Sequence, residues 1–203
     1  MATQSKPAFD ANIQRARRFL EIHEDVQQGA GAPPLRYREL PRAAIVFAVG
    51  AVDAYLSEVS AKVMVRQLQA DVANNATRET LRRVQQELPT LAIVVSVLAT
   101  NPERILRIRE AIADHFHNKV SNHGPRAVAA AMERIGHNAN EVWNHLTNQG
   151  YQQPADRLEH WTSVRHNIVH RGQRPSVHRP HAKGFIAFVD ALIARIDHIA
   201  ENA

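Results

Sequence analysis

Hydrophobic residues recur along this chain at intervals of three and four positions, the spacing that gives an α-helix one apolar face. The β-branched residues follow this same spacing and do not alternate with polar ones, so no strand is predicted. The pattern predicts helices from about residue 10 to the break at 29–34, and over 39–69, 77–87, 90–98, 102–120, 126–135, 139–147, 154–172 and 183–200. Asp10 is a typical N-cap and Gly172 a typical left-handed C-terminal cap. We therefore expect an all-α fold.

Length and composition favour one domain in a reducing compartment. The chain has 203 residues, 44% of them hydrophobic, which is enough for one substantial core. Cysteine is absent, which excludes disulfides and thiol nucleophiles. Residues 1–10 are polar, unlike a secretory signal, and the longest apolar runs, 43–51 and 91–99, are far shorter than the ~20 residues of a membrane helix. These features predict a soluble protein of the cytoplasm with no membrane partner.

The positive charge of the chain is concentrated near its C-terminal end. The formal net charge is +5, and the segment 160–189 contains no Asp or Glu. Five histidines fall inside it. So do five basic residues, namely Arg165, Arg171, Arg174, Arg179 and Lys183. A concentrated basic patch attracts polyanions through phosphate contacts and counterion release. The patch therefore favours a nucleic acid, or at least a phosphate, as the partner, and the residues expected to bind it are Arg171, Arg174, Arg179 and Lys183.

Within this segment, the run Arg165-His166-Asn167-Ile168-Val169-His170-Arg171-Gly172 combines imidazoles with guanidiniums at a helix end. Histidine accepts and donates protons near neutral pH, and arginine is the preferred fixed partner of a phosphate. His166 and His170 lie four residues apart and share one helix face. The alternative is a solvated basic helix end that interacts favourably with the helix dipole. The combination of Arg and His at this spacing, in an acid-free stretch, favours a site.

These residues resemble the HEPN superfamily of small all-helical domains, through the pattern Arg-x4-His with a polar residue after the Arg. The longer resemblance is to its RiboL-PSP-HEPN branch, because the stretch from Arg42 to Leu56 is similar to the long core helix of that branch. The resemblance covers the second helix and the last third of the chain. It implies an HEPN-like bundle spanning 1–203, with core helices at about 10–69 and 154–201 and additional, inserted helices at about 74–150.

The resemblance also implies a metal-independent ribonuclease without cofactor, commonly a homodimer in which two motif copies form one cleft. Arg165 and His170 are then the motif pair, and His166 occupies the polar position. RNA supplies its own 2′-hydroxyl nucleophile, so His170 would transfer the proton, Arg165 would stabilise the phosphorane charge and His166 would position the phosphate. One motif offers few groups for these tasks, which favours a dimer. The expected role is the toxin or effector of a bacterial defence or stress system, with a cognate antitoxin or regulatory protein as a further partner.

Several alternatives stay open at this point. Asp53 is the only charged residue between positions 43 and 56, and a buried carboxylate needs a partner, for which Arg165 or a motif histidine is the candidate. The alternative hypothesis, of equal weight, is that Asp53 reaches solvent or caps a neighbouring helix. The pairs His166/His170 and His115/His117 lack further ligands, so no metal site is predicted. The rivals of the ribonuclease hypothesis are a silent HEPN-like domain that binds RNA, nucleotide or a partner protein, and a helical adaptor.

Overall fold

The structure is a computed structural model that describes residues 5–26, 34–70, 72–87, 108–110, 112–113 and 124–203. The helices are α1 (Ser5–Val26), a 3-10 turn (Leu35–Tyr37), α2 (Leu40–Gln69), α3 (Asn75–Glu87), α6 (Pro125–Arg134), α7 (Asn140–Asn148), α8 (Pro154–Arg171) and α9 (Arg179–Asn202). No strand occurs among these residues, so the expected all-α class is confirmed. The expected helix at 90–98 and most of that at 102–120 lie outside the described residues.

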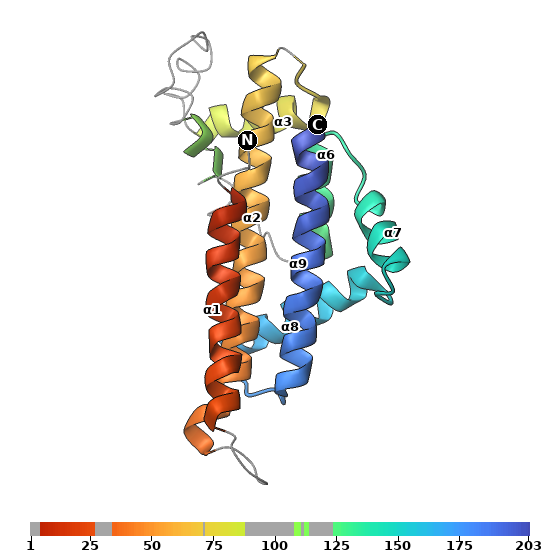
Figure 1. Cartoon of the computed structure of the whole chain (residues 1–203). Coiled ribbons are helices and arrows are strands. Elements are labelled where there is room, and N and C mark those ends of the chain that lie inside the picture. The colour runs from red at the N-terminus through yellow and green to blue at the C-terminus, as the bar shows by residue number, and fades with distance from the viewer. Residues whose placement is uncertain (1–4, 27–33, 71, 88–107, 111, 114–123) are drawn as a thin grey trace.

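Three long helices form the body of the molecule. Helix α1 runs antiparallel to α2, and α9 contacts both of them (Figure 1). Helix α8 crosses behind α9 and α2, and α6 and α7 cover the remaining side (Figure 1). This arrangement brings the helix that carries the Arg and His motif against the core helix α2.

Two helices begin earlier than the sequence pattern predicts. The expected N-cap at Asp10 is wrong, because α1 begins at Ser5 and the Asp10 carboxylate forms an ion pair with Lys6, one turn earlier on the same helix. Helix α9 begins at Arg179, before the expected Lys183, and proline at position 180 lies in its first turn, where a missing N–H costs nothing. In both helices the residues before the expected start also join the core, since α1 buries Phe9 and α9 buries Ala182.

Helix α2 is the central element because its side chains are buried on most of its surface. Its Tyr55 is 1% exposed, and the hydroxyl donates a hydrogen bond of 2.6 Å to Asp197 Oδ1 on α9. Burial, and secondarily this bond, raise the pKa of Tyr55 far above its ordinary value. Near its C-terminal end, Arg66 donates to the Ala200 carbonyl of α9 at 2.5 Å, where a cation favourably meets the helix dipole.

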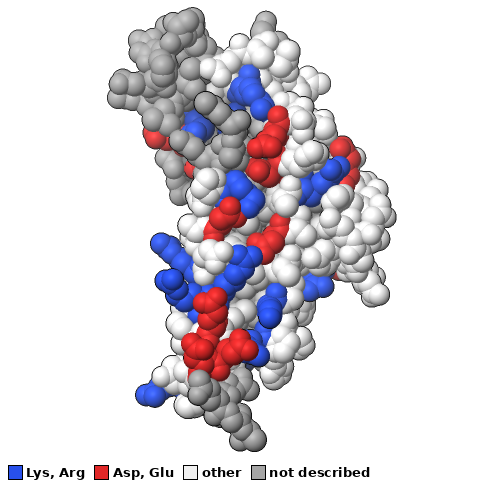
Figure 2. Space-filling model, in the orientation of Figure 1, with Lys and Arg blue, Asp and Glu red and all other residues white. Residues whose placement is uncertain are grey.

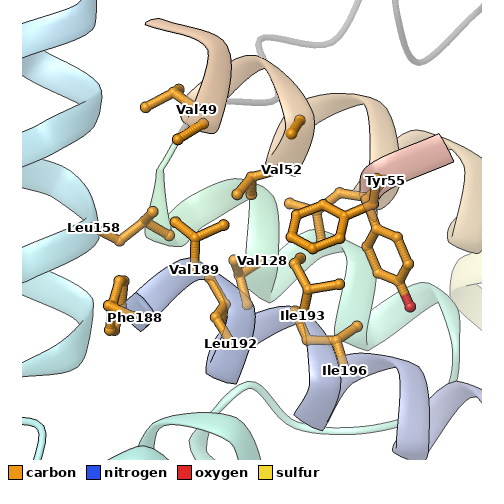
Figure 3. Close-up of a cluster of buried hydrophobic side chains, with 14 of the residues drawn as sticks. Val49, Val52, Tyr55, Val128, Leu158, Phe188, Val189, Leu192, Ile193 and Ile196 are labelled. Atoms are coloured by element: carbon orange, nitrogen blue, oxygen red, sulfur yellow. The ribbon is translucent and has the colours of Figure 1, made fainter. Parts of the chain in front are cut away.

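The main core is formed by α2 and α9 together with α1, α6, α7 and α8. Figure 3 shows apolar side chains from four of these helices converging: Val49, Val52 and Tyr55 of α2, Val128 of α6, Leu158 of α8, and Phe188, Val189, Leu192, Ile193 and Ile196 of α9. Burying each large apolar side chain contributes about 1.5–3 kcal/mol relative to exposure. Val128 and other residues of α6 and α7 fall in the region expected as an insertion, yet they pack into this same core. A second, smaller cluster joins the C-terminal half of α2 to Leu81 of α3 and to Ile108 and Ile112.

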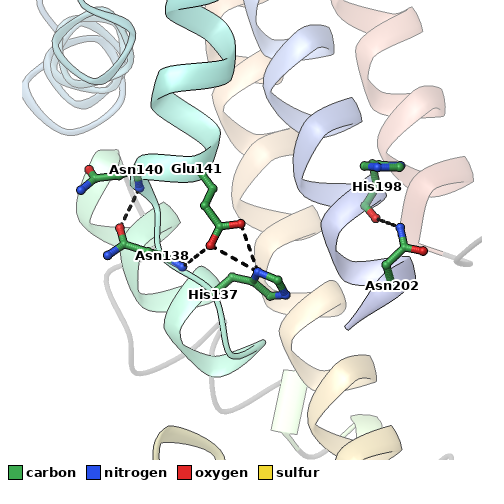
Figure 4. A network of polar contacts seen from close by, with 6 residues as sticks. All are labelled: His137, Asn138, Asn140, Glu141, His198 and Asn202. Carbon is green, nitrogen blue, oxygen red and sulfur yellow. Dashed lines mark hydrogen bonds and ion pairs between the residues drawn. The ribbon is translucent and has the colours of Figure 1, made fainter.

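A polar network closes the turn between α6 and α7 (Figure 4). The Glu141 carboxylate accepts a hydrogen bond of 3.1 Å from the Asn138 backbone N–H and contacts His137 Nδ1 at 3.2 Å. The Asn138 bond first, and His137 second, lower the pKa of Glu141. Asn138 Oδ1 accepts in turn from the Asn140 N–H at 2.8 Å. These bonds satisfy backbone groups that would otherwise be unpaired at the start of α7.

Among the described helices, α2 has the length and composition needed to cross a membrane, and 67% of its most apolar stretch is buried inside the protein. Such burial fits the core helix of a globular fold. The location of the protein stays a prediction.

Candidate active site

Helix α8 presents the motif at its C-terminal end. Its buried residues Pro154, Leu158 and Thr162 hold the N-terminal half against the core, and Arg165 is half-buried one turn further along. The helix ends at Gly172, whose φ of +60° and ψ of +18° are left-handed, so the predicted C-terminal cap is confirmed. The motif therefore lies where α8 leaves the core and meets solvent.

Arg165 and His170 are in direct contact, as their spacing allows. Arg165 Nη1 lies 3.2 Å from His170 Nε2, and the His166 and His170 rings lie 4.9 Å apart at an interplanar angle of 44°. A guanidinium only donates hydrogen bonds, so Nε2 must accept and the His170 imidazole carries its proton on Nδ1 when this bond is made. The structure thus brings together the three residues predicted as catalytic.

Both histidines are exposed, whereas Arg165 is half-buried. Val169, between the histidines, is 46% exposed and is one of the few large apolar side chains at the surface among the described residues. The two imidazoles are therefore accessible to a polymer, and an exposed apolar side chain lies beside them.

Asp53 lies on α2, the helix against which α8 packs. The residue is 9% exposed, and its backbone carbonyl accepts a 3.0 Å hydrogen bond from Ser57 Oγ. This burial favours a paired carboxylate over one that reaches solvent. The expected pairing of Asp53 with Arg165 or a motif histidine stays a prediction.

The predicted RNA-binding residues do not form one uniform basic patch. Arg171 is exposed at the end of α8, and Arg174 has a side chain 82% exposed, with Nε 3.9 Å from Glu39 Oε1. Arg179, in contrast, forms a 2.6 Å ion pair with Glu24 of α1. The segment is acid-free along the sequence, but in space its positive charge is partly neutralised, because α1 and the start of α2 bring carboxylates to it.

Lys183 belongs to the same mixed surface as Arg179. It lines a hollow of about 290 Å³ between α1 and α9, together with Glu21, Glu24 and Asp190. Figure 2 shows basic and acidic side chains intermixed over α1 and α9, with an acidic group at the lower end of this face. Arg171 and Arg174 are thus the better candidates for phosphate contacts, since their charge is less neutralised.

Arg42 supports the site, although the sequence alone does not indicate this role. Its side chain is 15% exposed, Nε donates to the Pro175 carbonyl at 2.7 Å, and Nη1 pairs with Glu39 at 2.8 Å. Arg42 therefore fixes the segment that follows the motif to the start of α2. The pairing with Glu39 was visible as an i, i+3 spacing, whereas the bond to Pro175 joins positions too distant in sequence to predict.

His23 of α1 is a second residue that the sequence alone does not single out. It is 6% exposed, and burial first, then the Arg179 charge, lower its pKa. The charged form of His23 is therefore disfavoured where α1 meets the start of α9.

The described residues contain no group of three or more His, Asp or Glu side chains arranged to hold a metal ion. His115 and His117 lie outside these residues. Comparisons of the chain with protein families, with curated proteins and with solved structures find no match.

Proposed function

We propose that this protein is a metal-independent endoribonuclease of HEPN type. The observation that carries the proposal is the 3.2 Å contact between Arg165 Nη1 and His170 Nε2 beside the His166 ring, at an exposed helix end. An acceptor nitrogen next to a fixed cation is the minimal equipment for cleaving RNA, because RNA provides the attacking hydroxyl itself.

In the proposed reaction, the Arg165 guanidinium moves from His170 Nε2 to the phosphate when RNA binds, which frees the one lone pair of Nε2. Nε2 then accepts the proton of the 2′-hydroxyl while that oxygen attacks the adjacent phosphorus, and Arg165 donates to the phosphorane oxygens. The bond from phosphorus to the 5′ oxygen then breaks, and a protonated imidazole supplies the proton to that oxygen. The products are a 2′,3′-cyclic phosphate and a 5′-hydroxyl. His166 positions the phosphate.

The active form in this proposal is a symmetric dimer in which the C-terminal ends of two α8 helices face each other. One Arg165, His166 and His170 set offers no separate base and acid, and two-fold symmetry doubles each group. The exposure of Val169 beside the motif supports such a contact. Repulsion between two basic segments opposes it, and the carboxylates near Arg174 and Arg179 offset part of that repulsion.

Cleavage of a single-stranded RNA by matched histidine variants tests the activity. His170→Ala should lower the rate about 10²–10⁴-fold, and Arg165→Ala about 10²–10³-fold. The control is His198→Ala, an exposed histidine of α9 outside the motif, which should leave the rate unchanged. Equal rates for the His170 and His198 variants would contradict the assignment. RNA binding without cleavage by the wild type would favour the silent RNA-binding domain instead.

The dimer is tested by mixing inactive subunits. If groups from two chains form one cleft, a mixture of Arg165→Ala and His170→Ala proteins should cleave RNA faster than either protein alone. Light scattering with a non-cleavable RNA should give twice the monomer mass plus the mass of the bound RNA. A monomer that cleaves at full rate would exclude the shared cleft. The role as a cytoplasmic toxin or effector with a cognate inhibitor belongs to this proposal and rests on the resemblance of the motif.

A further inference from the structure

An open pocket of about 480 Å³ lies between the first turns of α8 and α9, on the same helix as the motif. We call it the α8–α9 pocket, and its functional side chains are Gln152, Gln153, Asp156, Arg157, Trp161 and His181. Its volume lies within the range of about 300–1,000 Å³ that is typical of small-molecule sites. The ribonuclease mechanism uses none of these residues.

Trp161 gives the pocket a fixed aromatic wall. Its ring lies 5.4 Å from the buried Phe185 ring at 31°, and the His160 ring meets it edge-on at 5.0 Å. The residue is half-buried and lines the pocket. An indole held in this way is a ready surface for stacking, which contributes about 1–3 kcal/mol per nucleobase.

Arg157 gives the pocket a fixed cation. Its guanidinium lies over the Tyr151 and Phe188 rings, at 5.8 and 5.4 Å from their centroids. Glycine at position 184 permits this placement, because a Cβ there would lie 3.3 Å from Arg157 Nη2. Two cation–π contacts restrict the side chain, so the charge is preorganised rather than free to move through solvent.

The remaining lining groups are acceptors and amides at the start of α8. The backbone of Gln153 is left-handed, with φ of +43°, the only positive φ at a non-glycine residue in the described part of the chain. Such strain concentrates at functional sites. Asp156 supplies two carboxylate oxygens, and guanine alone among the RNA bases offers two neighbouring N–H donors on one edge to match them.

We propose that the α8–α9 pocket binds one unpaired guanine nucleotide, with the base on Trp161, its donor edge on Asp156 and its phosphate beside Arg157 and His181. Trp161 lies one helical turn before Arg165, so an RNA strand that crosses α8 reaches both residues. The role of the pocket as an RNA subsite rests on the proposed function. Binding of the free nucleotide does not depend on cleavage.

Fluorine NMR of the full chain labelled with 5-fluorotryptophan tests this inference. The chain has two tryptophans, and Trp143→Phe assigns their signals. Guanosine 5′-monophosphate should shift the Trp161 signal saturably and leave that of Trp143 unchanged. Uridine 5′-monophosphate should bind about tenfold more weakly, because it lacks one hydrogen bond to a charged group.

Matched variants separate base recognition from charge. Asp156→Asn should abolish the preference for guanine, whereas Glu133→Gln, an exposed acid on α6, should preserve it. The absence of a shift, an equal shift with ribose 5-phosphate, or an unchanged preference in Asp156→Asn would overturn the inference. Nucleotide binding without RNA cleavage would refute the ribonuclease alone, and cleavage without nucleotide binding would refute the pocket alone.

Discussion

The hydrogen bond between Tyr55 and Asp197 predicts how much stability the protein loses when the Tyr55 hydroxyl is removed. Tyr55→Phe removes one hydroxyl from a residue that is 1% exposed and whose bond to the Asp197 carboxylate measures 2.6 Å. Hydrogen bonds to charged groups contribute about 1.5–3 kcal/mol. Because Asp197 is only half-buried, water can hydrogen-bond to its carboxylate once the Tyr55 hydroxyl is gone. We therefore expect the free energy of unfolding to fall by about 1.5–2 kcal/mol, near the lower end of this range.

Tyr151→Phe is the matched control, because the Tyr151 hydroxyl donates to the Ala187 carbonyl at 3.4 Å in an exposed position. Its cost should stay below about 0.5 kcal/mol. Urea unfolding followed by circular dichroism measures both values. Equal losses, or no loss in Tyr55→Phe, would refute the reasoning.

The same bond predicts a pH dependence with a definite sign. Because the pKa of Tyr55 is raised in the folded state, its contribution is present below the unfolded pKa of about 10 and is lost above it, as the unfolded chain ionises. The wild type should therefore lose more stability above about pH 10 than Tyr55→Phe does.

Three further predictions concern the ends of α1, α8 and α9. The pKa of His23 is lowered by burial and by Arg179, so the neutral side chain stabilises the fold above the unfolded pKa of about 6.5. The free energy of unfolding should therefore fall as the pH drops below about 6.5, and it should fall less in His23→Leu. Gly172→Ala should lose roughly 1–2 kcal/mol in urea unfolding, because φ is +60°, whereas Gly172→Asn should lose less. Arg171→Ala should weaken RNA binding and reduce the slope of log K against log salt concentration by about 0.7. Arg179→Ala should change the affinity and the slope less, because Glu24 already neutralises Arg179.

Local patterns in the sequence predicted the elements that depend on local chemistry. The bounds of α2 and α8 follow from apolar periodicity and from signals such as Gly172, and the contact of Arg165 with His170 follows from their spacing on one helix. Asp10 misled the prediction because a good N-cap residue also forms i, i+4 ion pairs inside a helix.

What the sequence could not provide are contacts between segments that are distant along the chain. Glu24 meets Arg179, and Arg42 meets the Pro175 carbonyl, only because α1, α2 and α9 pack side by side. The α8–α9 pocket arises in the same way, since its two walls belong to different helices. Charge counted along the sequence therefore overstated how basic this surface is.

The most direct test of the proposed chemistry is the identity of the RNA ends formed in the presence of EDTA. If His170 removes the 2′-hydroxyl proton and Arg165 stabilises the phosphorane, wild-type protein should produce 2′,3′-cyclic phosphate and 5′-hydroxyl ends, and His170→Ala should produce neither above background. Cleavage that EDTA abolishes and Mg²⁺ restores, or products with 5′-phosphate ends, would contradict the account.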